Sequence, residues 1–422
     1  MALSRCGKRD AIKRPGECFS IDRVSRLRLS GVYKPDRMPN TASHMKRFFF
    51  RWVGVLGSAL VAFGAQAEQH LFLANQQDSR IDNFTLDPET GVLKKFETIE
   101  MPGNPGAMVF SQDKMHLYVA MQTGSGKDRG WGISTLKRGE GNSWKVVGTA
   151  KAPMRAPYLT VDSEKRFVLG AHYGDGKVSV QRIKNGVVTD EVTDIRETEV
   201  TAHCIELSAD DRYAYVPHTR PNKVYQFRFD ARNGKLTPND PAFVSGPATN
   251  KNFHMPRHIA FHPTLKMAFT SNERGGGISS WNFSRKNGRL KRRQTLSSLP
   301  PDFEGPAAAA DIHISPNGKL AIVSNRHLIP RNAPAGAPNK DTLAVFSIDL
   351  KSGKLRSTGH FATENMPRSI DIDQTGNFVF AAGQRSNKLA AYRIDYRAGS
   401  LERIATYETG RTPIWVECLM LD

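Results

Sequence analysis

The sequence predicts an all-β protein, a seven-bladed β-propeller whose last blade is built from both ends of the chain. Three observations predict this fold. One unit of sequence recurs along most of the chain, its strands alternate apolar and polar residues, and the incomplete last unit complements the N-terminal strands. No segment has the pattern of a long amphipathic helix.

The repeated unit runs Pro-x-x-apolar-x-apolar, a polar turn, an alternating strand, a loop and another alternating strand. Its starts are Pro105, Pro157, Ala202, Pro256, Ala310, Pro367 and Pro413, spaced by 52, 45, 54, 54, 57 and 46 residues. Blades of four strands take about 40–50 residues each. The repeat therefore indicates seven blades, and one large domain.

The last unit, PIWVECLML from Pro413, runs into the C-terminus without its later strands. The segment from Leu71, LFLANQQDSRIDNFTLD, has the pattern of the two middle strands of a blade. Joining them pairs the first and last strands and leaves no open edge. The alternative, a solenoid of β-units, requires capping repeats instead of complementary ends.

The N-terminal 67 residues precede the repeat. Residues 45–67 hold a basic start, an apolar run of 13 residues and the small-x-small ending Ala65-Gln66-Ala67, which is typical of a secretory signal peptide. Residues 1–44 have no apolar periodicity, and we interpret them as a non-native or disordered extension. The mature domain is then 68–422, periplasmic or secreted, without stable membrane insertion. An uncleaved anchor is the alternative, but 13 residues are too few to span a bilayer.

The formal net charge is +19, from 60 basic and 41 acidic residues. Residues 1–67 contain 13 basic and 4 acidic residues, which leaves 47 and 37, a net +10, for residues 68–422. The densest basic run, 285–293, fits a solvated hairpin better than a polyanion site. Without a basic stripe interleaved with aromatic residues, nucleic-acid binding is not expected. Cys204 and Cys418 lie in apolar strands, so we expect buried free thiols.

A propeller brings the start of each first strand and the end of each second strand to one funnel. Polar residues gather at these positions, although each alone could merely cap a strand. At first-strand starts they are His203, Arg257, His258, Asp311, His313 and Arg368, and at second-strand ends His172, Tyr173, His218, Asn272, Glu273, Asn325, Arg326, Gln384 and Arg385. So many polar groups around one channel indicate a ligand site. Two long loops on this face, 123–132 and 327–340, are either lids or tolerated insertions.

Several motifs carry a family resemblance: PRHIAFHP followed by AFTSNE, ADIHISPNGKLAIVSNR, PRSIDIDQTGNFVFAAGQ and the closing PIWV. Over Leu71–Leu421 the chain resembles the seven-bladed propeller lactonases of the 6-phosphogluconolactonase type, to which fungal carboxymuconate cyclases are related. The resemblance implies four catalytic residues, which are His203, Arg257, Glu273 and Arg326. The other funnel residues, expected to bind substrate, are His172, His258, Asp311, His313, Arg368 and Gln384.

These residue types suit hydrolysis of a lactone ester by water. Glu273 or His203 could accept the proton of the water, and the two arginines could stabilise the oxyanion or hold an anionic group. There is no serine nucleophile elbow and no convincing metal-binding set, so neither an acyl-enzyme nor a cofactor is expected. The export signal favours an unphosphorylated aldonolactone as the small-molecule substrate. The alternatives are a non-catalytic exported propeller that binds a protein or envelope ligand, and a carboxymuconate-type cyclase.

Overall fold

The computed structural model describes residues 68–248, 253–329 and 339–421. The predicted extension 1–44 and signal peptide 45–67 lie outside the described residues, as does the middle of the predicted loop 327–340. None of the helices in the described ranges is long and apolar enough to cross a lipid bilayer.

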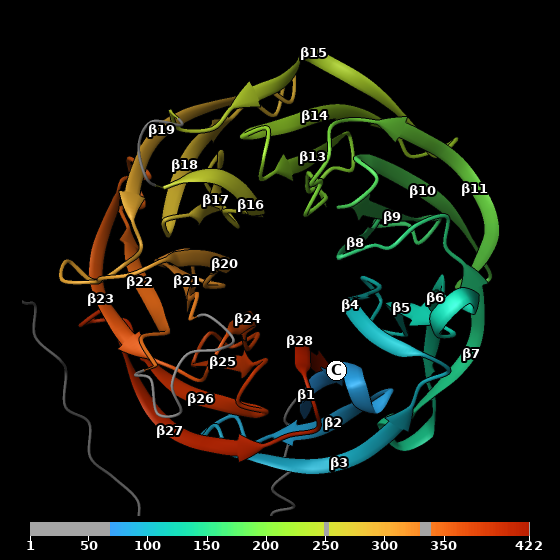
Figure 1. Cartoon of the computed structure of the whole chain (residues 1–422), viewed down its shortest axis with the longest axis horizontal. Helices are drawn as coiled ribbons and strands as arrows, with labels where there is room; N and C mark the ends of the chain where they lie inside the picture. The colour runs from blue at the N-terminus through green and yellow to red at the C-terminus, as the bar shows by residue number, and fades with distance from the viewer. Residues whose placement is uncertain (1–67, 249–252, 330–338, 422) are drawn as a thin grey trace, which may run out of the picture. The chain divides into compact units, whose positions relative to one another are not determined.

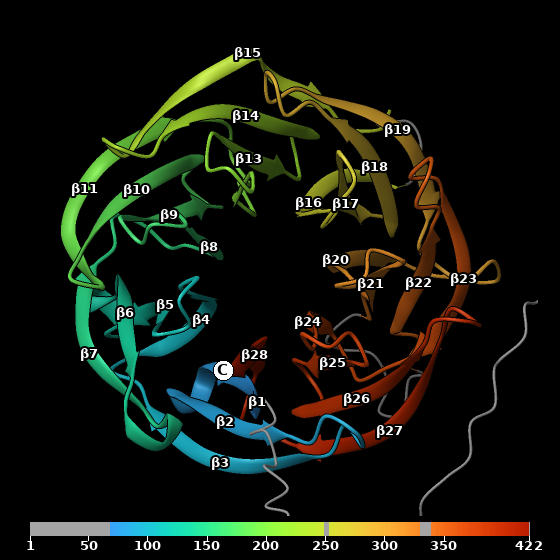
Figure 2. The ribbon, with the colours of Figure 1, turned by 180° about the vertical axis from the view of Figure 1, so that it is seen from behind.

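The described residues between 68 and 421 form seven four-stranded antiparallel blades around a central axis (Figure 1), and the ring is equally plain from behind (Figure 2). From inside to outside, blade 1 is β4 (Asn104–Phe110), β5 (His116–Thr123), β6 (Gly130–Arg138) and β7 (Trp144–Lys151). Blade 2 is β8 (Tyr158–Val161), β9 (Phe167–His172), β10 (Lys177–Lys184) and β11 (Val187–Glu197). Blade 3 is β12 (Glu206–Leu207), β13 (Tyr213–His218), β14 (Lys223–Asp230) and β15 (Lys235–Ser245).

The remaining blades follow the same order. Blade 4 is β16 (His254–Phe261), β17 (Met267–Arg274), β18 (Gly277–Phe283) and β19 (Leu290–Ser297). Blade 5 is β20 (Ala307–Ile314), β21 (Leu320–His327), β22 (Thr342–Ile348) and β23 (Leu355–Ala362). Blade 6 is β24 (Pro367–Ile372), β25 (Phe378–Gly383), β26 (Lys388–Asp395) and β27 (Ser400–Glu408). Blade 7 is β28 (Pro413–Leu421), β1 (Glu68–Asn75), β2 (Arg80–Leu86) and β3 (Leu93–Glu100). Short 3-10 helices lie at Gln76–Asp78, Gly126–Asp128 and Glu140–Asn142.

Blade 7 closes the ring as the sequence predicts. The C-terminal strand β28 is its inner strand and pairs antiparallel with β1 along nearly its whole length, from Glu68 opposite Leu421 to Asn75 opposite Pro413. Leu71 in the middle of β1 is fully buried. The pairing satisfies the backbone groups of both strands, which would otherwise be exposed edges.

The turn between the first two strands is stabilised in the same way in several blades. A polar side chain at the end of the first strand accepts a hydrogen bond from the backbone N–H five residues later. The pairs are Ser111 with His116, Asp162 with Phe167, Ser208 with Tyr213, Ser315 with Leu320, and Asp373 with Phe378. This contact explains the polar turn seen in these five repeats.

The hydrophobic core lies between neighbouring blades. In one cluster, Phe167 and Leu169 of blade 2 pack with Phe227 and Leu236 of blade 3. The outer turn of blade 3 reaches the preceding blade through a glycine with positive φ. Gly234 has φ +64°, and a Cβ there would lie 2.3 Å from the Phe167 ring.

Both cysteines of the described domain are buried free thiols, as expected. Burial raises the pKa of the Cys204 thiol and of the Cys418 thiol well above the ordinary value. They are therefore poor nucleophiles that act as small apolar side chains.

Replacing Gly234 with alanine should destabilise the ring far more than replacing Gly141. Gly141 has nearly the same φ, +61°, but a Cβ there would meet nothing within 4 Å. Gly141→Ala should lower the free energy of unfolding by about 1 kcal/mol through backbone strain alone. Gly234→Ala should add roughly 1–3 kcal/mol from the clash with Phe167, measured by urea unfolding. Equal losses would show that this turn does not hold the two blades together.

Candidate active site

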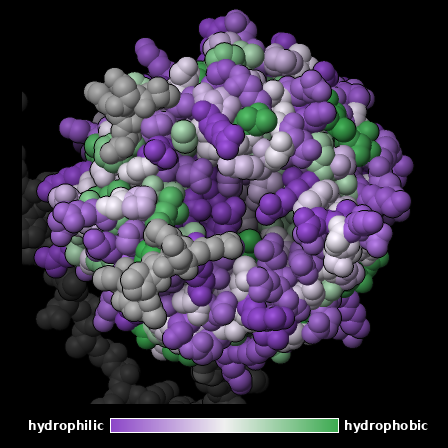
Figure 3. All heavy atoms as spheres, in the orientation of Figure 1, coloured by the Kyte–Doolittle hydropathy of each residue, from purple (hydrophilic) through white to green (hydrophobic). Residues whose placement is uncertain are grey.

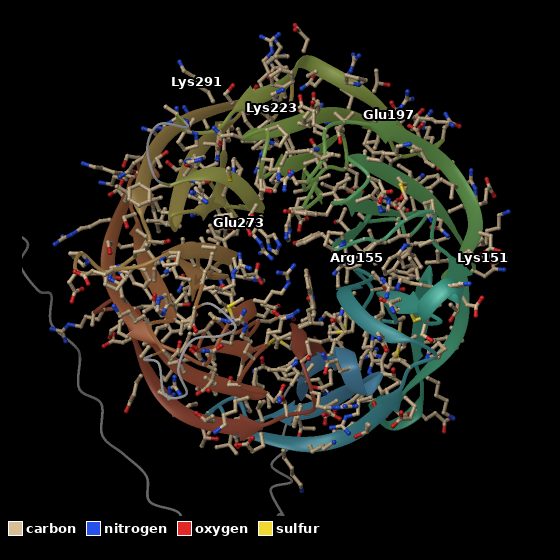
Figure 4. All side chains as sticks on the ribbon, in the orientation of Figure 1. Lys151, Arg155, Glu197, Lys223, Glu273 and Lys291 are labelled. Carbon is tan, nitrogen blue, oxygen red and sulfur yellow. The ribbon has the colours of Figure 1, made fainter. Side chains whose placement is uncertain are left out.

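The inner ends of the blades bring most of the predicted residues together at the centre of one face. One cavity of about 320 Å³ is lined by His203, Arg257, His258 and Arg368. An adjoining cavity of about 360 Å³ shares His203 and Arg368 and adds Tyr173, Glu273 and Gln384. Hydrophilic residues surround the central hollow in Figure 3. In Figure 4, Glu273 lies toward the centre of the ring, whereas Lys151, Glu197 and Lys291 lie at the rim.

The Glu273 carboxylate, at the end of β17, contacts two arginines from different strands. Arg326 Nη2 on β21 donates to Glu273 Oε1 at 2.9 Å, and Arg257 Nε on β16 lies 3.8 Å from the same oxygen. Arg326 Nη2 also donates to the Ala309 carbonyl at 3.1 Å. Burial opposes ionisation of Glu273, but the two guanidinium groups lower its pKa below the ordinary value. Glu273 is therefore a carboxylate at neutral pH.

Positive charge exceeds negative charge around these cavities. Arg257 and Arg326 are almost completely buried, and the Nε atom of each has no hydrogen-bond partner among the described residues. Burial, together with Arg326, lowers the pKa of Arg368 to about 10. Burial and the neighbouring Arg368 and Arg326 also hold the pKa of Arg257 well below its usual range. An anion bound beside these guanidinium groups would therefore stabilise their buried positive charge.

His203 supplies a neutral base next to these charges. It lies just before β12, is buried, and its Nδ1 has no hydrogen-bond partner among the described residues. Its ring packs edge-on against Tyr173, with centroids 5.5 Å apart, and lies 5.1 Å from the His258 ring. Burial and then Arg257 place the pKa of His203 well below 6.5, so its imidazole is uncharged at neutral pH.

His258 connects Arg257 to Asp311 on β20. Arg257 Nη1 lies 3.1 Å from His258 Nε2, and His258 Nδ1 lies 2.7 Å from Asp311 Oδ1. Because a guanidinium only donates, Nε2 accepts and Nδ1 carries the hydrogen that it donates to Asp311. Asp311 also accepts the backbone N–H groups of Ile312 and Ile370. The chain of contacts fixes the orientation of the Arg257 side chain.

A second set of ionisable groups adjoins Asp311. His313 lies 3.7 Å from Asp311 and 3.0 Å from Asp371. Although burial opposes it, the two carboxylates raise the pKa of His313 well above 6.5. Asp311 and His313 were predicted to bind substrate, but neither is among the residues lining the two cavities. Asp311 instead forms a hydrogen bond with His258, and His313 contacts Asp311.

His172 has a different position from the other predicted substrate ligands. Its Nδ1 lies 3.1 Å from the Arg155 carbonyl oxygen and its Nε2 lies 2.8 Å from Ser179 Oγ. It is not among the residues lining either cavity. Both ring nitrogens are engaged within blade 2, so His172 holds the Arg155 segment in place.

The structure adds residues that the sequence argument missed. Arg155 lies in the loop before β8, lines both cavities and places its guanidinium 6.0 Å from the Trp131 ring centroid. Figure 4 shows it across the centre from Glu273. Trp131 and Arg129 of the predicted loop 123–132 also line the first cavity, as does Trp415. Arg155 lies two residues before the start of a repeat at Pro157, and this position was the signal that could have identified it.

Glu206, on the inner strand β12 of blade 3, is a further partly buried carboxyl group. The Tyr158 hydroxyl donates a hydrogen bond to Glu206 Oε1, and Thr160 Oγ1 donates to Oε2 at 3.5 Å. Burial raises the pKa of Glu206 to about 7. Within the described ranges, no group of three or more His, Cys, Asp and Glu side chains is arranged to hold a metal ion.

The comparisons with known proteins agree with this architecture. The family model of the seven-bladed β-propeller lactonases matches residues 66–418, so the chain belongs to that family. A 6-phosphogluconolactonase of Pectobacterium carotovorum is 29% identical over 356 residues, which cover 84% of this chain and 100% of the relative. A 6-phosphogluconolactonase of Serratia proteamaculans is 29% identical over 353 residues, which are 83% of this chain and 99% of the relative. The solved structure of a periplasmic gluconolactonase from Pseudomonas aeruginosa superimposes with a TM-score of 0.72 and 21% identity, over 84% of this chain and 100% of that one.

Replacing Glu206 with glutamine should change how stability depends on pH. The folded-state pKa of about 7 lies above the unfolded value near 4.3, so the native state binds more protons in between. The contribution of Glu206 is therefore fully present below about pH 4 and is lost as pH rises through 7. Urea unfolding should show wild type losing on the order of 2 kcal/mol more than Glu206→Gln between pH 4.5 and 7.5. Parallel curves for the two proteins would contradict the raised pKa.

Proposed function

We propose that the protein hydrolyses the ester of a sugar lactone by direct attack of water in the two central cavities. One observation carries this proposal. A neutral histidine with an unpartnered Nδ1, His203, lines the same cavity as Arg257, a buried arginine whose Nε is also unpartnered. A base beside a fixed positive charge is what water attack on an ester carbonyl requires.

In the proposed reaction, the His203 imidazole accepts a proton as the water oxygen bonds to the carbonyl carbon. The carbonyl oxygen becomes an oxyanion, which the Arg257 guanidinium stabilises. The C=O bond then re-forms, the C–O bond of the ring breaks, and the imidazolium returns its proton to the departing ring oxygen. The product is an open-chain hydroxy acid, and no acyl-enzyme forms.

Glu273 is assigned a positioning role in this scheme. Its carboxylate already accepts a hydrogen bond from Arg326 and lies close to Arg257, and their charges lower its pKa. Glu273 Oε1 is thereby engaged by both arginines, whereas Nδ1 of His203 has no hydrogen-bond partner among the described residues. It keeps the two guanidinium groups, which would otherwise repel each other, on one side of the cavity.

The substrate we propose is an unphosphorylated aldonolactone. The expected signal peptide at residues 45–67 would export the chain, and sugar phosphates belong to the cytoplasm. The curated relatives are named 6-phosphogluconolactonase, which supports lactone chemistry, and the periplasmic gluconolactonase supports a role outside the cytoplasm. A direct test compares hydrolysis of gluconolactone and 6-phosphogluconolactone with their spontaneous opening. If the protein accelerates neither, it is not a sugar lactonase.

Removing the proposed base or the proposed oxyanion ligand should abolish most of the activity. His203→Gln should lower kcat by roughly 10²–10⁴-fold and Arg257→Ala by roughly 10²–10³-fold. The control is Arg292→Ala, because Arg292 is exposed on the outer strand β19. It should leave kcat and KM as in wild type. A His203→Gln protein with full kcat would move the base to another residue.

The pH profile provides an independent check on the assignment. Because the pKa of His203 lies well below 6.5 and that of Glu273 below 4.5, both groups stay unprotonated in mild acid. We therefore expect kcat/KM to change little between about pH 7.5 and 5.5. A base with the ordinary histidine pKa near 6.5 would lose about tenfold over this interval. A tenfold loss would contradict the electrostatic description of the site.

A further inference from the structure

A third and larger cavity lies beside the two polar ones. Its volume is about 900 Å³, against about 320 and 360 Å³ for the cavities that His203 lines. It lies between blades 4 and 5, from the ends of β17 and β21 out to β23, with the loop between β19 and β20 along its side. No residue of this loop was singled out by the sequence analysis.

The lining of this cavity is largely apolar. Its apolar side chains include Phe253, Met255, Leu299, Phe303, Ala307 and Leu328. Two of the few charged residues among the lining are Glu273 and Arg326, and Glu273 also lines the polar cavity next to His203. The Glu273–Arg326 ion pair is thus the boundary between a polar compartment and an apolar one.

The walls of the apolar chamber are held by specific contacts. Ala308, another lining residue, pairs with Arg326 on one side and with Arg274 on the other, and this second pair joins blades 4 and 5 into one sheet. The Phe303 ring packs edge-on against His327, with centroids 5.6 Å apart. The chamber is therefore bounded by ordered strand and loop residues.

A sugar lactone bound in the polar cavities would leave this chamber empty. Its ring carries hydroxyl groups that suit the polar cavities, and burying those groups against Leu, Phe and Ala side chains would cost free energy. An apolar chain gains free energy on entering such a space, about 0.8 kcal/mol for each methylene group. The location beside Glu273 and Arg326 means that a chain in the chamber can be joined to a ring beside His203.

We propose that the chamber binds an apolar chain carried by the substrate, and that the substrates include lactones with an alkyl or acyl substituent. This inference rests on the proposed lactonase function, because the chain is placed by a ring held in the polar cavities. The ester lies beside His203 and Arg257, the ion pair separates ring from chain, and the chain extends between blades 4 and 5. Chain length is then a determinant of specificity.

The first test measures chain-length preference. With the purified protein, kcat/KM for γ-decalactone should exceed that for γ-butyrolactone by at least about 30-fold, since each buried methylene contributes about fourfold. Leu328→Asp places a charge at the chamber wall on a side chain that is 38% exposed, so folding is not at risk. This variant should lower the ratio of the two kcat/KM values at least tenfold.

The matched control is Leu350→Asp, because Leu350 is a similarly exposed leucine that does not line the chamber. It should leave the ratio as in wild type. Equal kcat/KM for the long and short lactones, or the same ratio in wild type and Leu328→Asp, would overturn the proposal.

A binding measurement separates this proposal from the lactonase proposal. Titration calorimetry with decanoate and butanoate needs no turnover. Decanoate should bind at least about 30-fold more tightly than butanoate to wild type and lose that advantage in Leu328→Asp. If no lactone is hydrolysed but decanoate shows this pattern, the result supports the proposal that the chamber binds an apolar chain and contradicts the proposed lactonase function. If decanoate binds no better than butanoate, the chamber proposal fails whatever the activity.

Discussion

The pairing of β1 with β28 is the interaction on which the rest of the structure depends. Four different blades contribute to the candidate site: His203 comes from blade 3, Arg257 from blade 4, Arg326 from blade 5 and Arg368 from blade 6. Only a closed ring keeps these strands pointed at one centre. Strands β28 and β1 close it in blade 7 with a ladder of backbone hydrogen bonds whose register shifts once, between Ala74 and Asn75. A propeller left open there would expose two edges and let the cavities widen.

The second constraint is the balance of charge at that centre. Burying guanidinium groups without full hydrogen bonding is expensive, and the fold offsets the cost only in part. Glu273 accepts from Arg326 and lies near Arg257, while Asp311 acts through His258. The Nε atoms of Arg257 and Arg326 remain unpartnered among the described residues. A site kept in this state is arranged for an anion that arrives with the ligand or forms in the reaction.

The architecture could be predicted from the sequence because each repeat is recognised from residues that lie close together in the chain. Polar caps such as Ser208 and Asp373 and alternating strands recur in register, and the complementary ends at Leu71 and Pro413 identify the closure. The sequence also predicted that His203, Arg257 and Glu273 lie together at the centre of one face, since strand starts and ends map to one face. Arg155 and the loop before Ala307 were missed because they lie outside the repeat. The positions of His172 and Asp311 depend on contacts between side chains, which periodicity does not encode.

The central claim is that the buried arginines hold the negative charge of a lactone undergoing hydrolysis. A crystal structure of the protein with gluconate, the open-chain product, tests it most directly. The account predicts that the gluconate carboxylate lies within hydrogen-bond distance of the Arg257 guanidinium, with its hydroxyl groups in the cavity beside Tyr173 and Gln384. Gluconate bound only outside the two central cavities, or a carboxylate remote from every guanidinium group there, would contradict it.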